Sequence, residues 1–149
     1  MRTINRIANI ICVIIIATMV VLLLLNWNSL PDKVPTHFTF DGTPDGFGDK
    51  SALIREPVIA VVIFVLISVV QHFPQIWNFP VQLTAENMER EYLIASIMLN
   101  TLKVLLTSLF LISLLSVLIN GFPAWPMMIG IVITLVVPIV GIVLMFRVR

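Results

Sequence analysis

Long apolar runs alternate with short polar segments along the whole chain of 149 residues. A helix needs roughly 20 mostly apolar residues to cross the hydrocarbon core of a bilayer. The runs predict membrane-spanning helices at about residues 4–27, 57–75, 92–119 and 127–146. The polar segments predict an outer loop at 28–56 and an inner loop at 76–91. The pattern therefore indicates an all-α fold in which residues 1–149 form one membrane domain, a four-helix bundle with a small extracytoplasmic loop cap.

A few residues mark where these helices begin, end or bend. Pro57 suits the first position of the second helix, and Pro74 limits the same helix at its other end. Thr84 is expected to cap a long third helix that opens near it, ahead of the membrane. Pro138 predicts a kink in the fourth helix.

Composition excludes several classes of protein. Hydrophobic residues make up 59% of the chain and charged residues only 11%, whereas soluble domains carry about a quarter charged residues. A net charge of +1 gives no reason to expect nucleic-acid binding. The single cysteine, Cys12, excludes an internal disulfide framework.

Basic residues gather at both ends of the chain, as Arg2, Arg6, Arg147 and Arg149. With an even number of spans both ends lie on one side, and an excess of basic residues marks the cytoplasmic side. We therefore expect both termini in the cytoplasm and the outer loop outside.

The outer loop carries the most distinctive polar segment, PTHFTFDGTPDGFGDKS. Residues 36–40 alternate polar and aromatic side chains, which is typical of a short strand, and two turn signals follow. We expect a small β-hairpin or compact cap with Phe38, Phe40 and Phe47 packed down. Its aspartates recur every four residues, a spacing that does not match a calcium-binding loop. We expect no metal site.

Polar residues also occur inside the predicted spans. One stripe of the third helix carries four of them, at spacings of three and four: Ser96, Asn100, Lys103 and Thr107. A lysine in a span suggests an ion or substrate path. Alternatively its stem reaches the interface, or it bonds to Asn5, Asn9 or Gln71. On the fourth helix Gly130, Thr134 and Gly141 share a face that permits close helix packing, within the bundle or in a dimer.

Two motifs carry a resemblance to a known family. The first runs from Leu30 to Ser51 and comprises Pro31, Pro35, His37, Phe38, Gly42, Pro44, Asp45, Phe47, Gly48 and Lys50. The second follows the second span and comprises Asn78, Pro80, Thr84, Glu86, Asn87, Glu89, Arg90 and Tyr92. Together they resemble the domain-of-unknown-function 1648 family, over about the first 115 residues.

That domain also forms the N-terminal part of SdpI-type bacterial membrane proteins. The resemblance implies a multi-pass protein of the bacterial cytoplasmic membrane. SdpI-type proteins confer immunity to a secreted peptide toxin and sequester a repressor. Their additional C-terminal half is not expected within 149 residues, so the resemblance does not imply this function as a whole.

No motif of nucleophilic, phosphate-transfer or zinc chemistry occurs in the sequence. We therefore expect a non-enzymatic protein without cofactors, which binds a peptide, toxin or envelope component outside and a regulator or membrane partner inside. A small transporter or channel component that uses the Lys103 stripe is one alternative. A structural accessory subunit of a membrane complex is another. The number of copies that assemble is left open.

The candidate site residues fall into three groups. The outer binding residues are His37, Phe38, Asp41, Gly42, Pro44, Asp45, Phe47, Gly48 and Lys50. The inner binding residues are Asn78, Pro80, Asn87 and Arg90. The intramembrane polar residues are Asn100 and Lys103.

Overall fold

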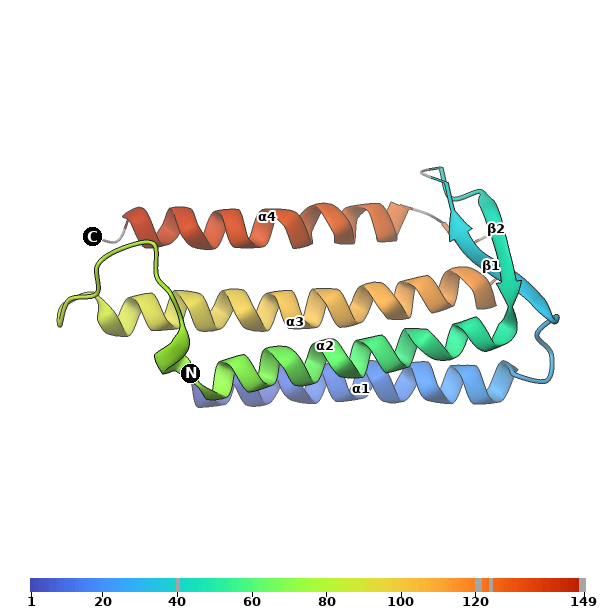
Figure 1. Cartoon of the computed structure of the whole chain (residues 1–149), viewed down its shortest axis with the longest axis horizontal. Helices are drawn as coiled ribbons and strands as arrows, with labels where there is room; N and C mark the ends of the chain where they lie inside the picture. Colours follow the sequence, from blue (N-terminus) through green and yellow to red (C-terminus); the bar gives the residue numbers. More distant parts are fainter. Residues whose placement is uncertain (40, 120–121, 124, 148–149) are drawn as a thin grey trace.

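Long helices lie side by side along the molecule, and a β-hairpin crosses one end of them (Figure 1). The computed structural model describes residues 1–39, 41–119, 122–123 and 125–147. The predictions made for Phe40 and Arg149 lie outside the described residues. The helices are α1 (Arg2–Asn26), α2 (Arg55–His72), α3 (Met88–Leu118) and α4 (Trp125–Arg147). All four are long and apolar enough to cross a membrane, so the predicted four-helix fold with a hairpin is confirmed.

Helix α3 is the centre of the bundle. It packs against α1, α2 and α4, while α1 also packs against α2. The outward faces are apolar: Leu24 and Leu25 of α1 and Leu135 of α4 are more than 60% exposed. In contrast, the buried face of α3 includes several polar side chains. Apolar surface outside and polar groups inside are the arrangement expected of a bundle surrounded by lipid.

The contact between α3 and α4 depends on glycine. A Cβ atom at Gly130 would lie 2.6 Å from Cδ2 of Leu109, and one at Gly141 would lie 2.7 Å from Sδ of Met98. The small-residue face of α4 therefore packs within the bundle. Helix α4 continues through Pro138 as one helix.

The hairpin consists of strands β1 (Lys33–Phe38) and β2 (Pro44–Asp49), paired antiparallel. Gly42 turns the chain with a φ of 86°, a conformation that favours glycine. A short 3₁₀ helix, η1 (Lys50–Ile54), then leads into α2. Val34 and Leu53 join a buried cluster with Met19 and Leu114 of the bundle. The hairpin is therefore packed onto the helices.

One prediction for the hairpin is wrong. Phe47 was expected to pack down, yet it is 64% exposed. The cause is the two-residue period of the strand, because Phe47 points to the same side as Asp45 and Asp49. Both aspartates are exposed as well.

The segment between α2 and α3 is held at both ends. It contains a short 3₁₀ helix, η2 (Pro74–Ile76), and the indole of Trp77 donates to the carbonyl of Val70 at the end of α2 (2.8 Å). Helix α3 begins at Met88, later than the predicted start near Thr84. The Thr84 amide donates to Oδ1 of Asn87 (2.8 Å), and the Asn87 amide donates to the Thr84 hydroxyl (3.3 Å). This reciprocal pair closes the turn that precedes the helix.

Candidate functional site

One candidate site is a pocket of about 1050 Å³ between the hairpin and the adjacent ends of α1, α3 and α4. The hairpin contributes polar side chains, among them Thr36, His37 and Thr43. Helices α3 and α4 contribute apolar ones, such as Val117 and Ile131. The pocket is thus polar where it meets the hairpin and apolar where it meets the helices. An amphipathic ligand would satisfy both parts.

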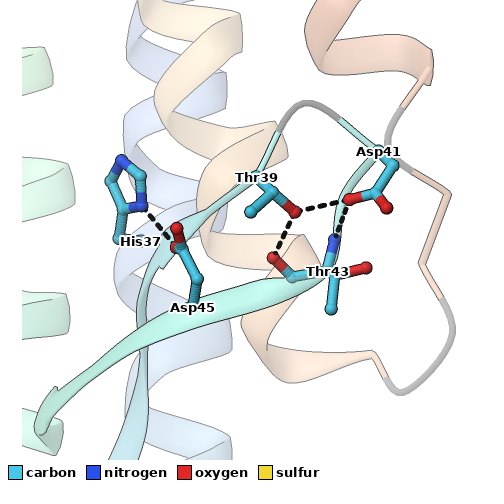
Figure 2. A network of polar contacts seen from close by, with 5 residues as sticks. All are labelled: His37, Thr39, Asp41, Thr43 and Asp45. Atoms are coloured by element: carbon cyan, nitrogen blue, oxygen red, sulfur yellow. Dashed lines mark hydrogen bonds and ion pairs between the residues drawn. The ribbon is translucent and has the colours of Figure 1, made fainter.

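Cross-strand contacts shape the hairpin above this pocket. His37 on β1 and Asp45 on β2 are joined through Nδ1 and Oδ1 (Figure 2). A Cβ atom at Gly46 would lie 2.9 Å from Cβ of His37, and one at Gly48 would lie 2.9 Å from Cγ2 of Thr36. The strands approach closely here because β2 presents glycine. The side chain of His37 is 72% exposed and that of Asp45 is 44% exposed.

The tip of the hairpin is stabilised by Asp41 (Figure 2). Its Oδ1 accepts from the backbone amide of Thr43 (3.1 Å) and contacts the hydroxyl of Thr39. The Thr39 amide in turn donates to the carbonyl of Thr43 (2.8 Å). The hydroxyl of Thr39, followed by the Thr43 amide, lowers the pKa of Asp41 below its usual value. Asp41 therefore acts in the turn as an ionised acceptor at neutral pH.

Two other charged residues organise the base of the hairpin. Oδ1 of Asp49 accepts the amide of Ser51 (2.8 Å) and starts η1, and hydrogen bonding from Ser51 lowers the pKa of Asp49. The Nζ atom of Lys50 lies 3.6 Å from Oδ1 of Asp32 and 5.6 Å from the ring centre of Trp27. Lys50 therefore connects the end of β2 to the segment that follows α1.

The predicted outer residues divide between two surfaces. His37, Phe38, Gly42 and Pro44 line the pocket. The others do not: Asp41, Asp45, Phe47, Gly48 and Lys50. Of these, the first three are exposed on the hairpin. The hairpin thus presents aspartates and one exposed phenylalanine to the outside, and a pocket to the helices.

Three of the four predicted inner residues gather around a second pocket, of about 700 Å³. Pro80, Asn87 and Arg90 line it, together with Thr84 and Glu86. Asn78 does not. The side-chain Nδ2 of Asn87 donates to the backbone carbonyl of Gln82 (3.0 Å), so Asn87 also holds the loop that forms the wall of this pocket.

Lys103 lies inside the bundle, with none of its surface exposed. Its Nζ atom donates to Oδ1 of Asn9 on α1 (2.5 Å) and to Oε1 of Gln71 on α2 (2.6 Å), with Oγ of Ser68 at 3.4 Å. Its side chain is enclosed by the helices and reaches no exposed surface of the bundle. Instead it is held by two of the three predicted partners, and it joins α3 to α1 and α2.

The remaining polar stripe of α3 also faces α1. The hydroxyl of Ser96 and Nδ2 of Asn100 both donate to Oδ1 of Asn5, at 3.1 and 2.7 Å. Farther along the helix, Thr107 contacts the thiol of Cys12 at 3.3 Å. The predicted stripe therefore faces α1 in two buried clusters, one in which Ser96 and Asn100 meet Asn5 and one that contains Lys103 and Thr107.

Comparison with known proteins adds the family. Residues 13–68 match the family model described as Domain of unknown function (DUF1648). These residues carry a DUF1648 domain. The domain runs from within α1 through the hairpin into α2, so it contains all the outer candidate residues. The inner motif lies beyond the matched residues.

One curated relative was found. It is an uncharacterized protein of Archaeoglobus fulgidus, 32% identical over 65 residues, which cover 38% of this chain and 36% of the relative. The chain thus spans about a third of the relative's length. No solved structure matches the chain.

Several residues of the sites were not found from the sequence. Ser68 is one, because a lone serine within an apolar span gives no pattern. The helical wall of the outer pocket is another, since Val117 and Ile131 belong to uniformly apolar runs. Glu91 is fully buried, and neither of its carboxylate oxygens has a hydrogen-bond partner within the described part of the chain.

Proposed function

We propose that this DUF1648-containing membrane protein is a non-enzymatic receptor whose outer cap binds a cationic, amphipathic peptide. The observation that carries the proposal is the pocket between the hairpin and α3 and α4, with its polar roof and apolar helical wall. A peptide lying at the membrane interface has the same two-sided character.

The charge of the hairpin supports a cationic ligand. Asp41, Asp45 and Asp49 are all exposed on it, and the pKa values of Asp41 and Asp49 are lowered. Exposed Phe47 stands between two of these carboxylates and offers an aromatic contact to an apolar or cationic side chain. Lysine or arginine on the peptide would be attracted to this face, whereas an acidic peptide would be repelled.

The binding experiment uses the full chain in nanodiscs of zwitterionic lipid. Two labelled helical peptides are compared, one built from leucine and lysine and the other with glutamate in place of every lysine. Fluorescence anisotropy is expected to show binding of the lysine peptide alone, above the level of empty nanodiscs. Equal binding of both peptides, or none above empty nanodiscs, would exclude the proposal.

A pair of matched variants separates the pocket from the lipid-facing surface. Leu118→Trp fills the pocket, whereas Leu135→Trp adds the same ring to an exposed position of α4. We expect the first to weaken peptide binding at least tenfold and the second to leave it unchanged. If both variants bind like the parent protein, the pocket is not the site.

The inner pocket favours a second contact, with a cytoplasmic or membrane partner. Arg90 and Glu86 line it with opposite charges, and the Thr84–Asn87 pair keeps its wall ordered. We place the docking of a regulator here. Arg90→Gln should then abolish co-purification of such a partner while the peptide still binds outside.

A further inference from the structure

A third depression lies on the opposite end of α1 from the hairpin. It measures about 540 Å³, and its polar lining consists of Arg2, Asn5, Arg6 and Asn9. The next turns of the same helix, with Ile10 and Val13, line the remainder. Both arginines are exposed, and no described residue forms an ion pair with either. The depression therefore changes from basic to apolar along the axis of α1.

The buried network behind this depression fixes which atoms it presents. Lys103 donates to Oδ1 of Asn9, and Ser96 and Asn100 donate to Oδ1 of Asn5. Each asparagine oxygen is therefore occupied from the inside of the bundle. The amide nitrogen of each, which is a donor only, has no acceptor among the described residues.

The lining thus offers hydrogen-bond donors and no acceptor side chain. Two guanidinium groups and two amide nitrogens point to an anion with several acceptor oxygens. The apolar turn beside them requires that this anion carry a hydrocarbon part. Basic pockets at the membrane interface are known to hold anionic headgroups.

We propose that this depression binds the phosphate headgroup of an anionic phospholipid, with one acyl chain against Ile10 and Val13. Arg2 and Arg6 pair with the phosphate oxygens, because guanidinium groups match them in geometry as well as charge. Asn5 and Asn9 are positioning donors, held in orientation by the buried polar network. The lipid thereby connects the bilayer surface to the residues that join α1, α2 and α3.

The test measures lipid retention by the full chain in a neutral detergent with native mass spectrometry. Phosphatidylglycerol is compared with phosphatidylcholine carrying the same acyl chains. We expect preferential retention of phosphatidylglycerol. An arginine next to an anionic surface contributes a factor of about 5, so Arg2→Gln with Arg6→Gln should weaken retention about 25-fold. The matched control is Arg147→Gln, at the same end of the bundle but outside the depression.

Asn9→Asp removes the amide donor while it keeps the hydrogen bond from Lys103 to the side-chain oxygen at this position. It keeps an oxygen that accepts from Lys103 but replaces the outward donor by an acceptor, so phosphatidylglycerol should be lost while the thermal unfolding midpoint is retained. Equal losses in the Arg147 control would indicate general charge attraction and overturn the proposal. So would an unchanged affinity in the double arginine variant, or displacement of the lipid by millimolar inorganic phosphate, which would assign the site to a free anion.

Discussion

The amino group of Lys103 is surrounded by neutral oxygens from two other helices. A charged side chain in the middle of a span costs about 2.5–3.5 kcal/mol on insertion scales. Hydrogen bonds to charged groups return about 1.5–3 kcal/mol each, so the short contacts with Asn9 and Gln71 offset this cost. Lys103 thus links α3 to α1 and α2 through hydrogen bonds. This structural role accounts for its position without a transport path.

We predict that Lys103→Met destabilises the bundle by about 2 kcal/mol, because the oxygens of Asn9 and Gln71 would then be buried without a donor. Unfolding in mixed micelles by added SDS would measure the change. The triple variant, with Asn9→Leu and Gln71→Leu added, should recover most of the loss because both sides of each contact are now apolar. If the triple variant is less stable than Lys103→Met, the unpaired oxygens of Asn9 and Gln71 are not the cause of the loss, and the role assigned to these hydrogen bonds is wrong.

The carboxylate of Asp41 gives a prediction about pH. Its pKa lies below the ordinary value of 3.8 because the ionised form accepts from Thr39 and Thr43. Ionised Asp41 therefore supports the hairpin turn at every pH above 3.8, and this support is lost as pH falls through the lowered pKa. A chemical-shift titration should place the midpoint of Asp41 below that value. Thr39→Val should raise it, whereas Asp49, which bonds to Ser51, should keep its own lowered midpoint.

At the scale of the elements, the glycines of α4 set its distance from α3. A Cβ at Gly141 would meet three atoms of Met98 within 3.5 Å, whereas one at Gly130 would meet only the outer part of Leu109. We predict that Gly141→Ala destabilises by about 1–2 kcal/mol through overpacking. Gly130→Ala should be close to neutral, since a rotation of Leu109 makes room and alanine favours the helix. Circular dichroism would compare the thermal unfolding midpoints of the two variants. A larger loss for Gly130→Ala than for Gly141→Ala would contradict this packing.

The apolar runs predicted the helices because length and hydropathy alone decide which segments suit a bilayer. The hairpin also followed from local chemistry, with alternation before Asp41 and glycine at the turn. The start of α3 was displaced because Asn87, three residues after Thr84, closes a separate turn. Phe47 was misplaced because aromatic character alone does not tell which side of a strand faces the bundle.

The sites were predictable where polar residues interrupt an apolar background. Asn9 and Gln71 were identified as partners of Lys103 because they stand near the same membrane face. The apolar wall of the outer pocket was not predicted, since residues such as Val117 cannot be told apart in sequence from the apolar residues around them. Tertiary packing determines which of these apolar side chains face the hairpin, and the spacing of residues in the sequence does not distinguish them.

At the scale of the whole molecule, the core of the bundle changes character along its length. Near the hairpin it is apolar, with Met19, Leu23 and Leu114 buried together. Toward the other end it becomes polar, with Asn100 and Lys103 buried at its centre. The outer pocket therefore sits on a tightly packed apolar support, and the proposed lipid site adjoins the polar network. A ligand at either end meets a part of the bundle with its own chemistry.

The orientation of these ends is the last prediction. Figure 1 shows the hairpin at one end of the bundle and the start of α1 with the 73–87 segment at the other. Excess basic residues at the latter favour the cytoplasm. In a Cys12→Ala background, a cysteine replacing Thr43 should react with a membrane-impermeant maleimide in intact cells, and one replacing Gln82 only after permeabilisation.

Both positions are exposed, so each should react fully in detergent, which controls for the reactivity of the thiol itself. Cys12 must be removed first, although it is buried, because unfolded protein would expose it and add background. If only the cysteine at position 82 reacted in intact cells, the protein would have the opposite orientation in the membrane. The aspartate-bearing cap would then face the cytoplasm, and a peptide arriving from outside could not reach the pocket beneath it.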